Sequence, residues 1–352
     1  MHHYHSLQKT LDTHPMGAPL SEEFIEILKI LFPPGEVELA LLLDFRLKKA
    51  EEIVQRAGIP AEEVLTKLEA MADRGSLLAK KVEGEPAYAL LPIYPGLFEY
   101  PVMKGGDEKT QKRLAELWHA YYMKAMAEEV ARANPPWNRV FPAEEALSEE
   151  YEIFPYEVAS KMMEKVETIA LANCPCRITT GRCDRPLDVC LSFDGAARFL
   201  SERGMARIIS REEAADVLKR SEEAGLVHTG SNMADRLVFM CNCCSCCCHF
   251  LRLLTEHNYT GGLAKSGHQA SLDATGCSGC GICAEERCPV RAITMKEDVA
   301  DLSPEKCIGC GLCVTTCPTG SLSLVRREGC QPPPATGGEL VKAIMANKQK
   351  AK

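Results

Sequence analysis

The chain has 352 residues, a formal net charge of −8 and 19 cysteines. This length gives room for two or three domains with ordinary cores, so disulfides are not needed as structural staples. The acidic balance argues against broad binding to a nucleic-acid backbone, and no stretch approaches the roughly 20 apolar residues of a membrane span.

The first residues, "MHHYHSLQKTLDTHP", contain no basic region followed by an apolar run, which predicts no secretory signal. We therefore expect a cytoplasmic protein, with an N-terminal tail over residues 1–19. Cysteines stay reduced in that compartment, and a dense set of them indicates metal ligands rather than disulfides. The composition thus predicts metal centres.

The segment 20–100 has helical periods and no cysteine. A first helix begins at the capping residue Ser21, and a later one has Pro60 at its start. The stretch "LLAKKVEGEPAYALLPI" predicts a β-hairpin that turns at Gly84. The stretch "AEEIVQRAGIPAEEVLTKLEAMADRGSL" resembles the winged-helix family. This resemblance implies a winged-helix-like domain of three helices and a hairpin.

A winged helix raises the question of DNA binding. The candidate recognition helix, residues 61–74, carries four acidic and two basic side chains. Phosphates would repel this charge, whereas a helix that reads bases brings Arg, Lys, Asn or Gln. We therefore expect a docking module or a homodimer interface here, and not a DNA-binding one.

Residues 101–149 are expected to form a helix and a connector. The stretch 107–133 has apolar side chains along one side and predicts a long helix whose buried face belongs to the core. The following "NPPWNRVFP" is rich in proline and predicts a connecting segment.

Residues 150–265 form a cysteine-rich segment, which we expect to be a mostly helical metal-binding domain. A helix and then an apolar strand would deliver Cys174 to a site, and two helices between 196 and 226 follow, the second starting near Ser210. The cysteines lie in a loop before these helices and a loop after them, so the two loops can meet. They are Cys174, Cys176, Cys183, Cys190, Cys241, Cys243, Cys244, Cys246, Cys247 and Cys248.

Isolated cysteines are commonly buried as small apolar residues, but "CNCCSCCC" at 241–248 places six in eight positions. We expect one or two further iron–sulfur clusters here. One cube with spare thiols, two cubes and a less usual cluster all remain open. The rival chemistry is redox exchange through C-x-x-C pairs. Among the histidines, His249 directly after Cys248 is the strongest candidate for an additional ligand.

Residues 266–329 contain the same cysteine unit twice, "CSGCGICAEERCP" and "CIGCGLCVTTCP". The second copy has the C-x2-C-x2-C-x3-C-P spacing that holds a 4Fe–4S cube. Residues 270–325 resemble a two-cluster bacterial-type ferredoxin domain with a (βαβ)2 fold. The resemblance implies two 4Fe–4S clusters with cross-over ligation. One would take Cys277, Cys280, Cys283 and Cys317, and the other Cys307, Cys310, Cys313 and Cys288, before which the first copy has one extra residue.

Residues 150–325 as a whole resemble iron–sulfur proteins of anaerobes in which a C-P-C-R loop and a C-N-C-C-x-C-C-C loop precede a two-cluster ferredoxin module. Residues 330–352 are expected to be a C-terminal tail with a short helical end, and Cys330 is not expected to be a ligand. The fold class is α+β, multidomain.

These features predict an electron-transfer protein, a non-catalytic carrier or oxidoreductase subunit of anaerobic metabolism with a redox protein as partner. Two alternatives stay open: a redox-sensing transcription regulator, and a reductase that works at the middle cluster. No G-x-G-x-x-G after a strand, P-loop or nucleophile elbow is found, so nucleotide and flavin sites are not supported.

Overall fold

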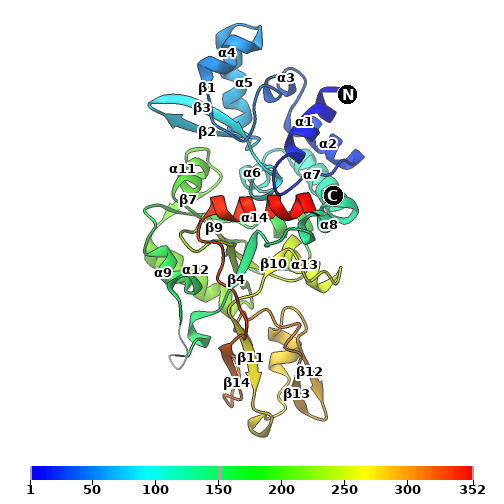
Figure 1. Cartoon of the computed structure of the whole chain (residues 1–352), viewed down its shortest axis with the longest axis vertical. Helices are drawn as coiled ribbons and strands as arrows, with labels where there is room; N and C mark the ends of the chain where they lie inside the picture. The colour runs from blue at the N-terminus through cyan, green and yellow to red at the C-terminus, as the bar shows by residue number, and fades with distance from the viewer. Residues whose placement is uncertain (1, 149–152, 351–352) are drawn as a thin grey trace.

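The computed structural model describes residues 2–148 and 153–350. The boundary expected between residues 149 and 150 lies outside the described residues, as do Met1 and the last two residues. The molecule is elongated, with N-terminal helices at one end, a seven-stranded sheet in the middle and the C-terminal cysteine repeat at the other end (Figure 1). No helix in the described ranges has the length and apolar character needed to traverse a bilayer.

The N-terminal region combines helices with a three-stranded antiparallel sheet of order β1-β3-β2. Ser21 caps its second helix because its hydroxyl accepts a hydrogen bond from the Phe24 N–H at 3.1 Å. The predicted hairpin is confirmed, and its turn at Glu83 and Gly84 has two positive φ angles. The elements are α1 (His2–Asp12), α2 (Glu22–Leu31), α3 (Val37–Ala40), β1 (Lys48–Lys49), α4 (Ala50–Ala57), α5 (Ala61–Asp73), β2 (Leu77–Val82) and β3 (Glu85–Leu90).

Residues 2–12 form a helix that packs on the core and are not a free tail. Helix α1 buries Leu7 and Leu11 completely, and the Tyr4 hydroxyl donates to the Phe32 carbonyl at 3.0 Å. The apolar period at positions 4, 7 and 11 explains this packing, because these residues share one face of a helix.

A helical layer connects this region to the sheet. It consists of α6 (Glu99–Lys104), α7 (Glu108–Tyr121), a wide helical turn (Tyr122–Met126) and α8 (Ala127–Ala131). Asp107 caps α7 by accepting from the Thr110 N–H at 2.9 Å. Trp118, Tyr121 and Tyr122 are fully buried, so the predicted apolar face of this long helix does belong to the core.

The middle of the molecule is a seven-stranded mixed sheet of order β10-β4-β8-β9-β6-β5-β7. The expectation of a mostly helical middle domain is therefore wrong. Among the described strand pairs of this sheet, β10–β4 is parallel and the others are antiparallel. The strands are β4 (Asn138–Phe141), β5 (Ile169–Asn173), β6 (Asp188–Phe193), β7 (Arg207–Ile209), β8 (Val227–Ser231), β9 (Phe239–Cys243) and β10 (Leu263–Ala264).

Strand β4 lies in the stretch expected to be a connector, and it pairs with β8 from Asn138 to Phe141. The expected helix–strand delivery of Cys174 and the two later helices are present, with the Ser210 hydroxyl accepting from the Glu213 N–H at 3.2 Å. The helices are α9 (Ala159–Met163), α10 (Pro175–Thr180), α11 (Asp194–Glu202), α12 (Arg211–Glu223) and α13 (His249–Thr255).

The C-terminal repeat forms two antiparallel strand pairs, β11 with β14 and β12 with β13. Each half of the repeat contributes one strand to each pair. The helical part of the first half is a single turn, Cys283–Arg287. The strands are β11 (His268–Leu272), β12 (Ile293–Lys296), β13 (Val299–Leu302) and β14 (Leu322–Arg326).

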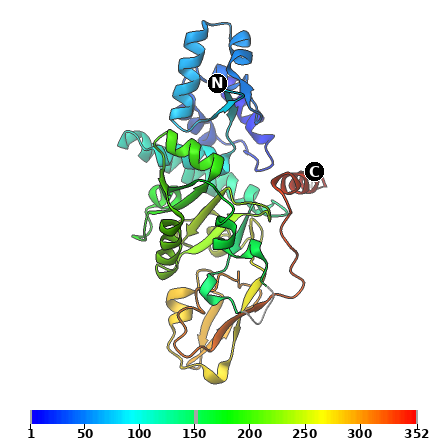
Figure 2. The same cartoon turned by 90° about the vertical axis from the view of Figure 1, so that its left-hand side faces the viewer.

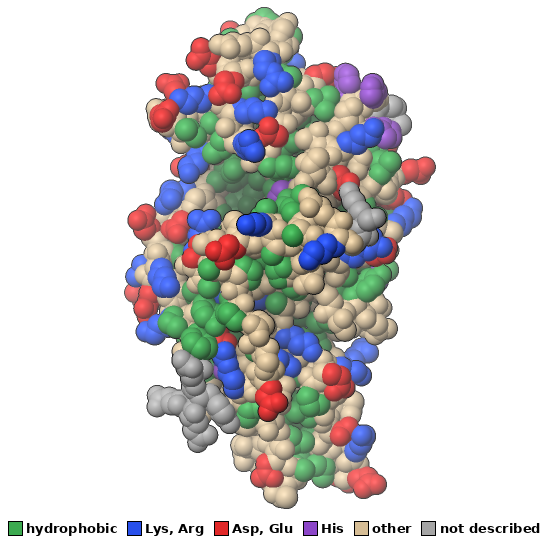
Figure 3. Space-filling view, viewed as in Figure 1, with side chains coloured by type: hydrophobic (Ala, Val, Ile, Leu, Met, Phe, Trp, Pro, Cys, Tyr) green, Lys and Arg blue, Asp and Glu red, His purple; other side chains and the backbone are tan. Residues whose placement is uncertain are grey.

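The C-terminal segment returns to the middle of the molecule and ends in helix α14 (Gly337–Lys350), as Figure 2 shows. Leu340 and Ile344 are buried against Met233 in a small apolar cluster. The ion pair between Lys348 and Glu129 fixes the far end of the helix. On the face drawn in Figure 3, a hollow with hydrophobic walls lies between α14 and the N-terminal region.

Candidate metal centres

The eight cysteines of the C-terminal repeat lie in two groups of four. Each group surrounds its own cavity and takes three cysteines from one half of the repeat and one from the other. One cavity is lined by Cys277, Cys280, Cys283 and Cys317, and the other by Cys288, Cys307, Cys310 and Cys313. The structure thus brings together both sets that the cross-over arrangement implies, and each set has the four thiols that one cube takes.

The extra residue before Cys288 is absorbed locally. The stretch Cys283–Arg287 forms one wide helical turn, which closes with a hydrogen bond from the Cys288 N–H to the Cys283 carbonyl at 3.0 Å. The insertion therefore widens a turn without moving Cys288 away from the second group. The Ala292 N–H donates to the Cys288 sulfur at 3.1 Å.

Two glycines in the cysteine loops have no room for a side chain. Gly279 and Gly309 have φ angles of +70° and +72°, in the left-handed region. A Cβ at Gly279 would lie 2.3 Å from the Asp298 carbonyl oxygen, and one at Gly309 would lie 2.1 Å from that of His268. The loops can therefore curl tightly around a cluster only with glycine at these positions.

The two groups differ in exposure. Cys280 of the first group is exposed, whereas Cys307, Cys310 and Cys313 of the second group are each only 8% exposed. The Cys310 carbonyl accepts from the Ala143 N–H of the chain after β4 at 2.9 Å. We call the first group distal and the second proximal, because this bond ties the second group to the chain that leaves the seven-stranded sheet.

Six of the ten middle cysteines form a closed ring of thiol contacts. Strands β6 and β9, the start of α10 and the start of α13 supply its members. In ring order these are Cys174, Cys176, Cys248, Cys243, Cys241 and Cys190, and the Cys190 thiol again contacts Cys174. We call them the six-thiol ring. Hydrogen bonding among the thiols makes the six pKa values differ strongly: it lowers those of Cys174 and Cys248, whereas the pKa values of the other four are raised, with burial adding to the rise.

The other four middle cysteines, Cys183, Cys244, Cys246 and Cys247, form a separate and tighter group. Their four sulfurs all lie within 4.8 Å of one another. The Cys183 sulfur is 3.7 Å from that of Cys244 and 3.9 Å from that of Cys247. We call them the four-thiol group. The ten middle cysteines thus divide into six and four.

Arg177, the arginine of "CPCR", stands between the two groups. It is 2% exposed, and its Nε donates to the Cys244 sulfur at 3.5 Å while its remaining nitrogens donate to the carbonyls of Pro186 and Asn242. Hydrogen bonding by Cys247, reinforced by the Arg177 charge, lowers the pKa of the Cys244 thiol to about 5. The guanidinium therefore favours thiolate at the four-thiol group.

A mainly apolar cavity adjoins the six-thiol ring. The N-terminal region lines it with Tyr94 and Glu99, and the middle region lines it with Thr229, Phe250 and ring members such as Cys248. Burial raises the pKa of the Glu99 carboxyl to about 8, although a hydrogen bond from the Gly96 N–H opposes this rise. The N-terminal region and the middle region therefore both line the cavity beside the ring.

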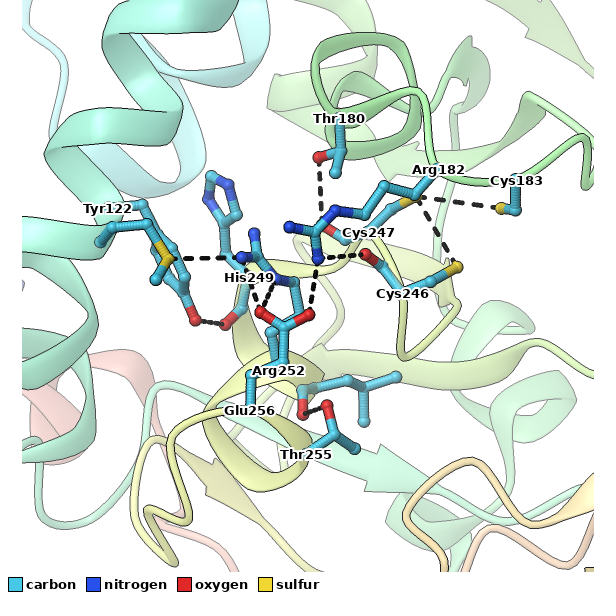
Figure 4. Close-up of polar contacts among 12 residues, drawn as sticks. Tyr122, Thr180, Arg182, Cys183, Cys246, Cys247, His249, Arg252, Thr255 and Glu256 are labelled. Carbon is cyan, nitrogen blue, oxygen red and sulfur yellow. Dashed lines mark hydrogen bonds and ion pairs between the residues drawn. The ribbon is translucent and has the colours of Figure 1, made fainter.

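His249 lies beside the ring but packs into an aromatic cluster. Its Nδ1 is 2.8 Å from the Tyr94 hydroxyl, and its ring stacks on Tyr122 with centroids 4.3 Å apart. Figure 4 shows the Tyr122 hydroxyl reaching the His249 carbonyl, a hydrogen bond of 2.7 Å. Burial lowers the pKa of His249 to about 3. These contacts give the imidazole a packing role.

A chain of hydrogen bonds links the proximal group to the six-thiol ring. Arg287, next to Cys288, donates to the carbonyls of Glu222 at 2.8 Å and Glu223 at 3.0 Å, at the end of α12. The Glu222 carboxylate is 2.8 Å from Nε2 of His228, whose Nδ1 contacts the Asn242 side chain. Asn242 lies between the ring members Cys241 and Cys243 in the sequence. The contacts therefore connect the loop of the proximal group with the ring.

Sequence reasoning missed Arg177, Asn242 and the cavity residues Tyr94 and Glu99. Arg177 and Asn242 lie within the C-P-C-R and C-N-C-C motifs, so their positions in the sequence could have identified them. No local sequence pattern marks Tyr94 or Glu99. Cys330, not expected to be a ligand, lies beside Arg139, Glu157 and Arg326 in another cavity.

A comparison with protein-family models finds a 4Fe–4S dicluster domain over residues 276–321. Neither the curated proteins nor the solved structures give a match. The match covers the two ferredoxin-type cysteine groups and stops short of the middle cysteines. The chain therefore carries a 4Fe–4S dicluster domain of the ferredoxin type, joined to a middle region with its own cluster of cysteines.

Proposed function

We propose that this chain is an electron-transfer protein in which the dicluster domain connects a redox partner protein to a metal–sulfur cluster in the six-thiol ring. The observation that carries the proposal is the order of the three sites. The distal group has an exposed cysteine, Cys280, whereas the proximal group is bonded to the chain that follows β4 through the Cys310 carbonyl. From the proximal group, the hydrogen bonds of Arg287 lead on toward the ring.

Bound 4Fe–4S cubes take up and release single electrons. The protein tunes such sites through burial and through hydrogen bonds to sulfur. The N–H of Ala270 donates to Cys307 at 3.4 Å and that of Ala292 to Cys288 at 3.1 Å. Because only the proximal group has both these bonds and strong burial, we expect the two cubes to have different potentials.

The six-thiol ring offers two thiols more than one cube takes. A cluster with more than four metal ions would use the whole ring, whereas a single cube would leave two thiols spare. Both cases add iron to the eight ions of the dicluster domain, so we expect a total of about twelve or more per chain, on four per cube.

The partner would be a donor or acceptor oxidoreductase of anaerobic metabolism, and it would dock near the distal group. Cys280 is the exposed ligand there. The N-terminal region would serve as a docking or homodimerisation module. Leu47 and Leu65, each 37% exposed, would lie in such a contact.

The test uses the full chain, prepared without oxygen, and a reduced two-cluster ferredoxin as the electron donor. A protein donor reaches only the surface, unlike a small dye. We expect Cys280→Ser to slow reduction of the middle centre at least tenfold and Cys330→Ser, a cysteine outside both groups, to leave the rate unchanged. Equal rates in the two variants would contradict relay through the distal group.

A second candidate function, reduction of a small molecule at the ring, is favoured by the cavity beside it. Its walls combine apolar side chains with the Tyr94 hydroxyl and the Glu99 carboxyl. Such a mixture suits a small, largely uncharged substrate. Turnover of a small molecule by the reduced chain, lost on filling the cavity with Thr229→Leu, would favour this function over pure relay.

The regulator alternative is disfavoured by the charges on α5. The two basic residues of the candidate recognition helix are already paired, Lys67 with Glu63 at 2.6 Å and Arg74 with Glu36. Either side chain would have to break its ion pair before it could contact a phosphate. A mobility-shift assay at low salt that found tight, sequence-selective binding would reverse this conclusion.

A further inference from the structure

We infer that the four-thiol group binds a single tetrahedral metal ion, zinc(II), and not an iron–sulfur cluster. The group consists of Cys183, Cys244, Cys246 and Cys247. This inference stands apart from the proposed electron relay, because zinc in such a site does not change its oxidation state.

The spacing of the sulfurs carries the argument. Four sulfurs at the corners of a tetrahedron, each about 2.3 Å from zinc, lie about 3.8 Å from one another. The sulfur separations in the structure are 3.7 Å for Cys183 with Cys244, 3.9 Å for Cys183 with Cys247 and 3.8 Å for Cys246 with Cys247. The group therefore already has the size of a zinc tetrathiolate site.

The other cysteines of the same chain provide an internal comparison. A cube separates its four thiolates more widely, because each binds a different iron. Among the described residues, the four-thiol group is the cysteine set whose sulfurs lie mutually within 4.8 Å; neither dicluster group nor the six-thiol ring is so compact. The sulfurs of the two groups in the dicluster domain are thus spaced more widely than the sulfurs of the four-thiol group.

The surroundings fit a metal ion with four thiolates, which together carry a net charge of −2. Arg177 donates to the Cys244 sulfur at 3.5 Å, and Arg182 lies beside Cys246, whose carbonyl it contacts at 3.5 Å. Figure 4 shows Arg182 reaching from the Cys183 loop over the Cys246 turn to Glu256. Two cationic side chains therefore border the anionic site.

The ion would have a structural task. Residues 181–187 form no helix or strand, and Cys183 lies within them. Apart from its thiol contacts, this segment meets the turn 244–247 through a long hydrogen bond from the Arg182 guanidinium to the Cys246 carbonyl at 3.5 Å. A zinc ion held by Cys183 and three cysteines of the turn would lock the loop and thereby support the ring on the other side of Arg177.

The decisive experiment measures zinc, iron and acid-labile sulfide on the anaerobically prepared full chain and on two variants. We expect one zinc per chain. Cys183→Ser should lose the zinc and keep all the iron and sulfide. Cys190→Ser should lose only the iron and sulfide bound in the ring and keep the zinc. Loss of iron and sulfide together from Cys183→Ser, or loss of a single iron in place of zinc, would overturn the assignment.

X-ray absorption at the zinc edge of the unmodified chain keeps the inference testable if a variant fails to fold. One shell of four sulfurs with no second metal nearby would support it, and nitrogen or oxygen ligands would overturn it. Failure of the electron relay would instead appear in the reduction kinetics, which zinc does not affect.

Discussion

Replacing Arg177 with methionine should destabilise the middle region strongly, because this buried guanidinium satisfies several groups at once. Its neighbours include the carbonyls of Pro186 and Asn242 and the thiol of Cys244. Methionine keeps the apolar stem but donates no hydrogen bond. Each of the two carbonyls left unpaired costs about 1–3 kcal/mol, which gives a loss of about 2–6 kcal/mol in the free energy of unfolding.

Arg182, in the loop that follows α10, provides a matched control. It is 41% exposed and pairs with Glu256 at 2.6 Å, so Arg182→Met should cost about 1 kcal/mol or less. The assay is urea unfolding of both full-length variants without oxygen, followed by far-ultraviolet circular dichroism and by loss of visible cluster absorbance. If the two variants unfold within 1 kcal/mol of each other, Arg177 does not hold the two cysteine loops together.

Three further predictions concern other parts of the chain. Gly309→Ala should remove the proximal cluster and lower the iron content by about four ions per chain. The control, Gly320→Ala, has a similar φ of +69° but open space around the added Cβ, so it should keep all the iron. Equal iron content in the two variants would refute the argument that Gly309 has no room for a side chain. Burial lowers the pKa of His14 to about 4, so the folded chain keeps this ring neutral where the unfolded chain protonates it. The free energy of unfolding should therefore fall by about 2.5 kcal/mol as the pH drops from 6.5 to 4. His14→Asn should show a shallower decline in unfolding experiments across that range, and identical profiles would contradict the assignment. Ile344→Ala, at a fully buried site of α14, should cost about 2–4 kcal/mol and expose the helix to limited proteolysis, while Val341→Ala on its outer face should be cut no faster than the parent chain.

Local signals in the sequence were sufficient for the elements that depend on local chemistry. Ser21 and Ser210 cap helices where their positions predicted, because an N-cap acts within three residues. Gly84 turns the hairpin because two successive positive φ angles need a residue like glycine. The dicluster grouping was also within reach, because the resemblance to two-cluster ferredoxins implies cross-over ligation.

The division of "CNCCSCCC" could not be predicted, because it depends on where a strand ends. Cys241 and Cys243 lie in β9 and share one face, so both join the ring. Cys244 follows the strand end and turns to the other group, whereas Cys248 caps the next helix and returns to the ring. No sequence period marks these changes of direction.

The seven-stranded sheet was missed for a related reason. Its strands are at most six residues long, and they lie between turns and cysteines that favour an irregular interpretation. The pairing of β4 with β8 joins residues about 90 positions apart. Such long-range hydrogen bonding leaves no local pattern, so Asn138–Phe141 was interpreted as part of a connector.

The path of the C-terminal segment has a mechanical consequence. The dicluster domain leaves the sheet after β10 and rejoins the middle of the molecule through residues 334 and 335, whose carbonyls accept from the N–H groups of Ala234 and Asp235 at 3.0 and 3.1 Å. The domain is therefore anchored at both its beginning and its end (Figure 2). A module tethered at one end can swing and deliver electrons by collision, but one tied at both ends cannot. In the proposed relay, electron tunnelling between the clusters of the domain and the ring would then take place over a fixed distance, and its rate would be insensitive to solvent viscosity.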